Sequence, residues 1–241
     1  MGREPGAPAR ERRTRGRAAG GAAAKIRYLG RTAQQAESRE RRRAILEATL
    51  RIIVREGMRG VRHRAIAREA GVPLAATTYY FKDLSDLIAD AFNLYAEDTL
   101  RETQDLERGS LAALAQYAPG DLPDPGARAE LARALERQLV AHVGAQVRRR
   151  DARILEHAFR NEALRNEKLA AIAQVPHART LASIADFLER CGTSDPESDA
   201  RLIFGCILEL EYEMLVGAAD LRRVERSVRR LVGHVLGVPQ R

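Results

Sequence analysis

The segment IAREAGVPLAATTYY, residues 66–80, combines two short helical stretches with a tight break between them. Before the break, a helix is predicted over residues 62–70, with Ile66 facing inward. Gly71 can adopt a positive φ angle, where a Cβ atom would clash, and Pro73 suits the first position of a new helix because it lacks a backbone N–H. Two helices of about two turns joined in this way are typical of the helix-turn-helix arrangement, although other helical hairpins share the pattern.

A longer amphipathic helix precedes this segment. From Ser38 to Glu56, apolar residues recur every three or four positions, which is the period of a helix with one buried face. Gly57 follows directly and supplies a stop signal. The sequence therefore predicts three consecutive helices, of which the last two form the helix-turn-helix.

The wider pattern is more specific than the turn alone. Its parts are Ile45-Leu46-Glu47-Ala48-Thr49-Leu50, Gly57, Ile66 to Pro73, Thr77-Thr78-Tyr79-Tyr80-Phe81-Lys82 and Leu87. Over about 47 residues, Ser38 to Leu84, this string closely resembles the N-terminal DNA-binding domain of the tetracycline repressor (TetR) family. The resemblance implies an all-helical homodimer in which three N-terminal helices bind operator DNA. A larger helical domain would bind a small effector and form the dimer.

On this basis we expect an all-α protein with three parts. Residues 1–37 form a disordered basic tail, residues 38–84 form the helix-turn-helix DNA-binding domain, and residues 85–241 form the effector-binding and dimerisation domain. The expected function is that of a transcriptional regulator, a ligand-responsive repressor that binds a near-palindromic operator as a homodimer. The alternative is a DNA-binding dimer without a small-molecule pocket, controlled by a protein partner.

The resemblance assigns DNA contacts to the two short helices. Residues 74–77 fall where the family's recognition helix meets base edges, and their small or apolar side chains suit thymine methyl groups. The hydroxyls of Thr78, Tyr79 and Tyr80 match positions that reach phosphates, with packing as the alternative for each tyrosine. The predicted DNA-binding residues are Arg62, His63, Arg64, Pro73, Leu74, Ala75, Ala76, Thr77, Thr78, Tyr79, Tyr80 and Lys82.

Two of these positions depart from the family's pattern. Arg62 stands where a Ser or Thr usually caps the second helix, so the capping hydroxyl is missing. Leu84 stands where many members have a phosphate-binding lysine, and Lys82 is the nearest replacement. The N-terminal N–H groups of the second helix, beside Arg62 and Arg64, still form a phosphate site, with an ordinary charged surface as the alternative.

The positive charge is concentrated near the N-terminus. The chain carries a net charge of +8, and residues 1–43 hold 13 Arg or Lys against four Glu, whereas residues 44–241 sum to −1. A polyanion is therefore attracted to one end of the molecule. The tail, rich in Gly, Ala and Arg, is either a basic arm that contacts DNA or a solvated extension, and the sequence leaves both open.

Beyond the DNA-binding domain we expect a helical body. A long helix starts at Leu84, with its apolar residues on one face. The next stretch, residues 117–126, is rich in Pro and Gly and is predicted to be a loop. Further helices are predicted over residues 127–150, 151–174 and 177–191, with Pro176 between the last two.

One histidine interrupts an apolar stripe in this body. His142 follows leucines at helical spacing, and a buried polar group needs a partner. A ligand in a cavity is one such partner, and a neighbouring carbonyl or carboxylate is the other. The candidate ligand-binding residues are Tyr95, Tyr117, His142, His157 and Glu162.

Two heptad-like seams occur near the C-terminus, on helices that begin after Asp195 and Asp220. The resemblance places the dimer interface there, and packing inside one protomer is the alternative. The predicted interface residues are Ile203, Ile207, Leu210, Met214, Leu221, Val224, Val228, Leu231 and Val235.

Other classes of function find little support. No stretch approaches the roughly 18 uninterrupted apolar residues of a membrane span, so we expect a cytoplasmic protein without membrane contact. No nucleophile elbow, phosphate-binding Gly-rich loop or HExxH motif occurs, and the five histidines are scattered, so we expect no enzyme activity. We expect no metal and no cofactor. The expected partners are double-stranded operator DNA, a second copy of the chain and a small-molecule effector.

Overall fold

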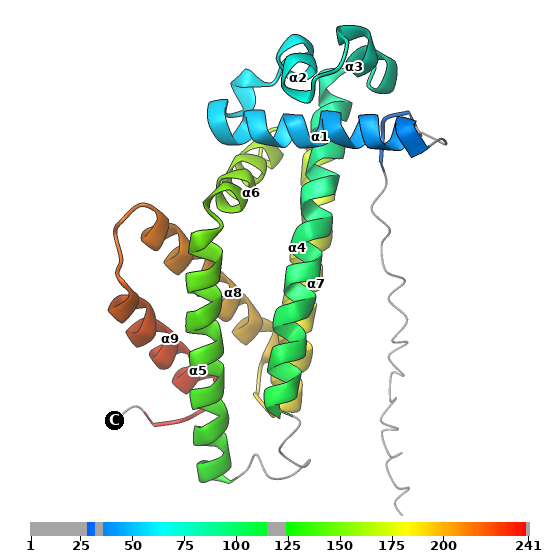
Figure 1. Ribbon diagram of the computed structural model, residues 1–241. Helices are drawn as coiled ribbons and strands as arrows, with labels where there is room; N and C mark the ends of the chain where they lie inside the picture. The colour runs from blue at the N-terminus through cyan, green and yellow to red at the C-terminus, as the bar shows by residue number, and fades with distance from the viewer. Residues whose placement is uncertain (1–27, 32–35, 115–123, 240–241) are drawn as a thin grey trace, which may run out of the picture.

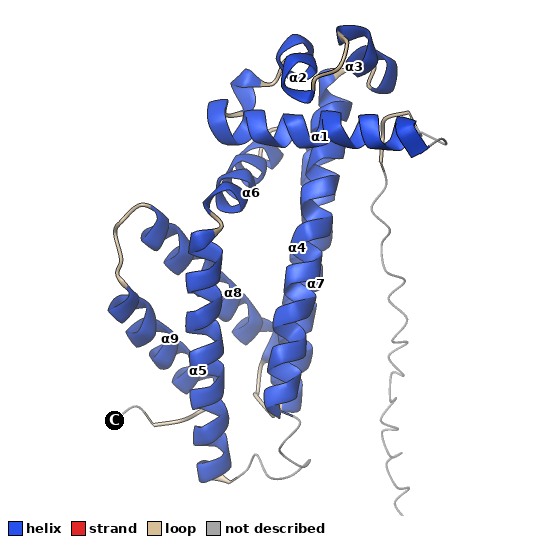
Figure 2. Ribbon diagram, viewed as in Figure 1, coloured by secondary structure: helices blue, strands red, loops and turns tan. Residues whose placement is uncertain are grey.

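The computed structural model describes residues 28–31, 36–114 and 124–239, and Tyr117 and residues 1–27 lie outside these ranges. Within the described residues all regular structure is helical (Figures 1 and 2). The predicted all-α fold is therefore confirmed. The elements are α1 (Ala36–Glu56), the 3-10 turn η1 (Met58–Gly60), α2 (His63–Ala70), α3 (Leu74–Tyr80), α4 (Leu84–Leu114), α5 (Pro125–Arg148), α6 (Arg150–Ala163), α7 (Glu167–Arg190), α8 (Pro196–Leu215) and α9 (Leu221–Val235).

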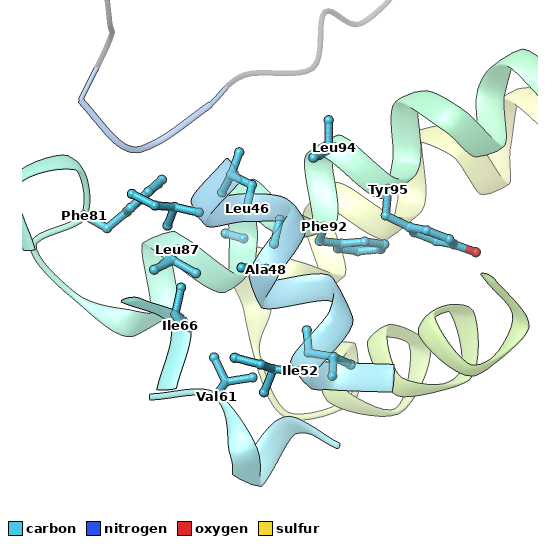
Figure 3. Packing of buried hydrophobic residues seen from close by; sticks show 14 of the residues in the cluster. Leu46, Ala48, Ile52, Val61, Ile66, Phe81, Leu87, Phe92, Leu94 and Tyr95 are labelled. Atoms are coloured by element: carbon cyan, nitrogen blue, oxygen red, sulfur yellow. The ribbon is translucent and has the colours of Figure 1, made fainter. Parts of the chain in front are cut away.

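The first three helices form a head. In Figure 1, α1 crosses one end of α4, and α2 and α3 lie on the side of α1 that faces away from the body. Ile45, Ile66 and Phe81 are completely buried where these helices meet, as Figure 3 shows for the last two. Gly71 ends α2 with φ 65°, in the left-handed region that favours glycine, and Pro73 precedes the first residue of α3. The predicted helix-turn-helix is present.

The body is built on α4 and α7, which run side by side, and on α5, α8 and α9, which pack together beyond them (Figure 1). One hydrophobic core joins the head to α4, α6 and α7, and a second lies among α5, α7, α8 and α9. Because α4 belongs to the head-side core along its first part, movements of this helix reach the head. No described helix combines the length and the apolar character needed to cross a membrane.

The helix boundaries differ from the prediction at Pro176, which lies inside α7 and separates no elements. The break falls earlier, where α6 ends and Asn166 caps the next helix. Its side-chain oxygen accepts from the backbone N–H groups of Lys168 and Leu169 at 3.1 and 3.3 Å. A proline inside a helix costs about 3 kcal/mol, and α7 tolerates it because the helix packs along α4 and α8 on both sides of the proline.

Candidate DNA interface and ligand cavity

The open face of α3 carries most of the residues predicted to contact DNA. Leu74 and Tyr79 are 44% and 55% exposed, although both have large apolar surfaces. Ala76 is half-buried against the core of the head. A short ridge of small and apolar side chains therefore faces solvent beside two hydroxyl groups. The exposed residues of this ridge are Pro73, Leu74, Ala75, Thr78 and Tyr79.

Thr77 and Tyr80, also predicted to contact DNA, point into the head instead. Thr77 is fully buried, and its hydroxyl donates to the carbonyl oxygen of Leu74 at 2.8 Å and lies 3.2 Å from Nδ1 of the half-buried His63. Tyr80 is 5% exposed, and its hydroxyl lies 2.8 Å from Oγ of Ser38. Contrary to the expectation, neither side chain is open to bases or phosphates. Three residues apart on one helix, they share its inner face.

Cations flank the open face of α3. Arg62 and Arg64 are exposed at the start of α2, and Lys82 is exposed just after α3. Among the described residues none of these three pairs with a carboxylate, whereas the exposed Arg51 of α1 binds Glu69 at 2.8 Å. The unpaired cations are therefore available for phosphate oxygens on either side of the ridge. Arg62 makes no side-chain capping hydrogen bond, in line with the missing hydroxyl noted in the sequence.

A short segment ahead of α1, Tyr28–Arg31, packs on the head, although the sequence predicted a disordered tail through residue 37. The backbone N–H groups of Leu29 and Gly30 donate to the two carboxylate oxygens of Asp90 on α4, at 2.6 and 2.7 Å. Asp90 is fully buried and also pairs with Arg42 of α1. One carboxylate thus ties this segment, α1 and α4 together.

The same segment ends beside α3. The N–H of Arg31 donates to the carbonyl oxygen of Tyr80 at 2.9 Å, and the guanidinium carbon of Arg31 lies 4.4 Å from the ring centroid of Tyr79. A Cβ atom on Gly30 would lie 2.5 Å from the ring of Phe81, so this close approach requires glycine. The segment therefore ends next to the open face of α3, whereas the hydroxyl of its first residue, Tyr28, donates to Oε1 of Glu97 on α4 at 2.9 Å.

A cavity of about 440 Å³ lies among helices α4 to α9. This volume suits a small organic molecule, and most of the wall is apolar, with Phe92, Leu135 and Ile207 among its residues. Of the predicted ligand-binding residues, Tyr95 and His142 line the cavity. No group of three or more His, Cys, Asp or Glu side chains in the described ranges is arranged to hold a metal ion.

The remaining ligand candidates lie elsewhere. His157 is exposed and its ring packs edge-on against Tyr212, 5.2 Å between centroids, and Glu162 is half-buried without reaching the cavity. Tyr117 is outside the described residues. His157 and Glu162 are therefore not part of this cavity, although their neighbours Glu156 and Ala163 line it.

The polar end of the cavity holds a buried charged cluster that the sequence analysis missed. Nη1 of Arg153 donates to Oε2 of Glu156 at 2.5 Å and to Oε2 of Glu211 at 3.1 Å. Nε2 of His142 lies 3.5 Å from the other oxygen of Glu211. Tyr95 completes the cluster from α4. A signal was present in the sequence, since Glu211, alone among Glu209, Glu211 and Glu213, falls at helical spacing between the apolar residues Ile207 and Met214.

Burial shifts the protonation equilibria of this cluster. Burial raises the pKa of Glu211 to about 7, and the attraction of Arg153 offsets only part of that effect. Burial, together with repulsion by Arg153, lowers the pKa of His142 to about 4, so its imidazole is neutral at pH 7. Burial also raises the pKa of Tyr95 to about 12. Near neutral pH, Glu211 is therefore the member of the cluster that gains or loses a proton.

The two predicted dimer seams lie mostly inside the protomer. Five of the nine residues are buried, because α8 and α9 turn these faces toward α5 and α7. Ile203, Met214 and Leu231 are half-buried against the same core, and Leu221 is 49% exposed. This burial agrees with the alternative, packing inside one protomer, and the assignment of the seams to the dimer interface stays a prediction. The buried five are Ile207, Leu210, Val224, Val228 and Val235.

Apolar side chains are exposed on the opposite face of α8. Leu202, Tyr212 and Val216 are 51%, 46% and 56% exposed, and Gly205 is exposed between them. These four positions lie on one face of the helix and at its C-cap, with the exposed Glu209 between Gly205 and Tyr212. With Leu221 at the start of α9, we call these residues the outer α8 stripe.

Comparisons with known proteins agree with this architecture. Residues 45–91 match the family described as bacterial regulatory proteins, tetR family, and residues 126–238 match the tetracyclin repressor-like C-terminal domain. Together the two matches cover well over half of the chain. A curated relative, the HTH-type transcriptional regulator PksA of Bacillus subtilis (strain 168), is 38% identical over 73 residues. That match spans 30% of this chain and 36% of the length of PksA.

Solved structures share the fold at lower identity. A TetR-family regulator from Mesorhizobium loti MAFF303099 is 20% identical, with a TM-score of 0.60 over 84% of this chain and 98% of that one. A transcriptional regulator from Saccharomonospora viridis, crystallised in complex with choline, is 22% identical, with a TM-score of 0.58 over 81% and 97% of the two chains. At these identities the likeness shows the fold alone.

Proposed function

This chain belongs to the TetR family of bacterial regulatory proteins, and from that premise we propose that it is a ligand-responsive transcriptional repressor that binds a near-palindromic operator as a homodimer. The observation that carries the proposal is the open face of α3 between unpaired cations. A protein of this kind acts where the chromosome is, so we place it in the cytoplasm.

The proposed docking puts α3 into the major groove. Leu74 and Ala75 are small enough to approach bases, and thymine methyl groups suit their apolar surfaces. Thr78 and Tyr79 supply hydroxyls, while Arg62 and Arg64 meet phosphates on one side of the groove. The described part of the ridge offers no Arg or Asn for bidentate reading of a base, so specificity rests on shape and van der Waals fit.

Dimerisation places two copies of α3 about one helical turn of DNA apart, about 34 Å between half-site centres. The outer α8 stripe is the surface that we assign to the contact between copies. It supports this role because its exposed apolar side chains, which flank the exposed Glu209, lie on a helix that has its other face in the protomer core.

The cavity favours control by a small molecule rather than control by a protein partner alone. It is bordered by α4 at Phe92 and Tyr95, and the start of the same helix lies in the core of the head. A ligand that binds one arrangement of α4 better than another therefore changes the spacing of the two heads. A coupling of about 1 to 3 kcal/mol between ligand and DNA is the usual size of such effects.

Selection of bound sequences from random double-stranded DNA tests the proposal. We expect a near-palindrome with half-sites about one turn apart, and affinity that falls steeply with salt because arginines contact phosphates. Arg64→Ala is expected to flatten the salt dependence. Recovery of no enriched sequence, or of single half-sites without symmetry, would overturn the proposed function.

A further inference from the structure

The short segment ahead of α1 runs along α4 toward the end of α3. At its start, the hydroxyl of Tyr28 donates to Glu97. The backbone N–H groups of the next two residues donate to Asp90, about two helical turns nearer the start of α4. The N–H of Arg31 then donates to the carbonyl oxygen of Tyr80, the last residue of α3. Hydrogen bonds therefore fix the backbone of the segment along its length, and Arg31 is its residue at the open face of α3.

The side chain of Arg31 is held in place with its hydrogen-bond donors free. Its guanidinium carbon lies 4.4 Å from the ring centroid of Tyr79, within the range of a cation–π contact. Such a contact uses the flat face of the guanidinium, whereas the N–H donors point outward in the plane of the group. A side chain that already rests on a ring also loses less conformational freedom when it binds a partner. The donors of Arg31 are therefore both available and positioned in advance.

No carboxylate within the described part of the chain pairs with Arg31, although its side chain is exposed. The exposed Arg41 of α1, by contrast, pairs with Glu37 at 2.6 Å. The carboxylate of Asp90, which holds the backbone of the segment, is already paired with Arg42. Arg31 is thus a positioned cation without an acidic partner among the residues that the structure describes.

We propose that Arg31 binds a phosphate group of the DNA backbone, beside the groove that α3 enters. The planar guanidinium matches two oxygens of one phosphate, so the two groups can form a pair of parallel hydrogen bonds. The contact adds to those assigned from the sequence, and it supplies a cation at the end of α3 that leads to Leu84, where the family's lysine is missing. The inference rests on the proposed function for the docking of α3 on DNA.

A phosphate fits the position of Arg31 better than a base edge does. In helix-turn-helix proteins the N-terminal residues of the recognition helix contact base edges, and Leu74 and Ala75 occupy those positions here. Arg31 lies at the opposite end of α3, where its backbone is bonded to Tyr80. A phosphate contact carries no sequence information of its own, so its loss weakens binding to all duplexes similarly. Loss of a base contact would weaken binding to particular sequences only.

The salt dependence of DNA binding measures the predicted contact. Fluorescence anisotropy titrations of the purified full-length chain use the operator obtained by selection and a random duplex of the same length. We expect Arg31→Ala to weaken binding to both duplexes about tenfold at 0.1 M salt. The slope of log affinity against log salt concentration should fall by about two, because a dimer loses two phosphate contacts worth about 0.9 each.

Two further variants separate the charge of Arg31 from other effects. Arg31→Lys keeps the positive charge and should keep the salt slope of the unaltered chain. Arg179→Ala removes an exposed arginine from α7, in the body, and should change neither the affinity nor the slope. All three substitutions leave the backbone N–H groups of the segment in place, so we expect little change in melting temperature.

Neutralising single phosphates locates the contact. A set of operators carries one methylphosphonate at a different position in each half-site. We expect one position at which the modification weakens binding of the unaltered chain about tenfold but leaves the affinity of Arg31→Ala unchanged. Tyr79→Phe, which keeps the ring under the guanidinium, should still respond at that position. Absence of such a position, or a loss in Arg31→Ala that is confined to operators with one particular base pair, would overturn the inference.

The same measurements distinguish failure of the inference from failure of the proposed function. If the unaltered chain selects an operator and Arg31→Ala binds it with the same affinity and salt slope, the inference fails and the proposed function stands. If the unaltered chain selects no sequence but binds the random duplex with a salt slope that Arg31→Ala lowers, the proposed function fails and the phosphate contact stands. If it binds neither duplex, both are overturned.

Discussion

The neighbouring hydroxyls of Tyr79 and Tyr80 have opposite environments, and this contrast separates a DNA contact from a structural one. Tyr79 is 55% exposed beside Arg31, whereas the hydroxyl of Tyr80 is buried against Ser38. We predict that Tyr79→Phe weakens operator binding about fivefold, the value of one hydrogen bond of about 1 kcal/mol. The measurement is a titration of labelled operator at constant salt.

The control for this prediction is Tyr80→Phe. It removes an equally sized hydroxyl from the inner face of α3, so we expect a lower melting temperature and little change in operator affinity for the folded protein. A larger loss of affinity in Tyr80→Phe than in Tyr79→Phe would contradict the assignment of the two faces.

The buried imidazole of His142 makes folding depend on acid. Its folded-state pKa, about 4, lies below the ordinary value of 6.5, because burial and Arg153 disfavour the charged ring. Unfolding lets the ring take up a proton, so the corresponding stability is present above about pH 6.5 and is lost as pH falls toward 4. We predict that, when the pH is lowered from 7 to 4, the unfolding free energy of His142→Gln falls by about 2 kcal/mol less than that of the unaltered chain. Urea unfolding at each pH measures this difference.

His234→Gln is the matched control, because His234 is exposed on α9. Parallel pH profiles for His142→Gln and the unaltered chain would refute the role of His142. The comparison between variants matters because Glu211 titrates in the opposite sense. Its raised pKa stabilises the folded chain at low pH, and that stability is lost as pH rises through about 7.

How far single residues could be predicted depends on whether their partners are local. The resemblance placed Leu74 and Tyr79 on the DNA-facing side, where both are exposed, but it also placed Thr77 and Tyr80 there, and these two are buried. Asp90 contacts residues some 60 positions earlier in the chain. In the sequence around Asp90, the one sign of these contacts is an acidic residue within an apolar stripe. Long-range partners of this kind require the fold.

At the scale of elements, capping residues and turns predicted where a helix begins better than proline predicted where a helix ends. Asp195 and Asp220 cap α8 and α9 as expected, each accepting from a backbone N–H in the first turn. Pro176 was taken as a break, yet α7 continues through it. Packing against two neighbouring helices outweighs the local cost, and such packing is invisible in a single sequence.

The segment Tyr28–Arg31 gives an element-scale prediction, since one side chain of α4 holds it in place. Asp90→Asn removes the charge that compensates Arg42, whose side chain is only 13% exposed, and weakens the bonds to Leu29 and Gly30. We predict a loss of about 2 kcal/mol in unfolding free energy and faster tryptic cleavage after Arg31. Denaturant titration and a time course of limited proteolysis measure the two effects.

Asp86→Asn, also on α4, serves as the comparison. Asp86 pairs with Lys168, whose side chain is 55% exposed, so its loss should change the unfolding free energy much less than Asp90→Asn and leave cleavage after Arg31 unchanged. Similar effects of the two substitutions would mean that Asp90 does not hold the segment. Operator affinity of Asp90→Asn then shows whether the placement of Arg31 beside α3 aids DNA binding.

For the whole molecule, in the proposed dimer, the arrangement of the two heads depends on which face of α8 meets the second copy. The apolar seam predicted from the heptad pattern packs inside the protomer. The pattern alone does not distinguish the two cases, because two helices that pack within one chain have the same period as two that pack between chains. What remains open to a partner is the outer α8 stripe. Exposed apolar side chains grouped on one face of a helix support the proposed contact between copies.

We predict that Tyr212→Glu converts the dimer to a monomer and lowers operator affinity at least a hundredfold, because a single head reads only one half-site and loses the linkage to the second. Light scattering after gel filtration measures the mass, and a full operator compared with an isolated half-site measures the linkage. Leu164→Glu places the same charge on a residue that is 83% exposed between α6 and α7, and it should remain dimeric. If Tyr212→Glu is still a dimer, the interface does not lie on the outer α8 stripe. If the unaltered chain binds full and half operators with equal affinity, the two heads do not act as a pair.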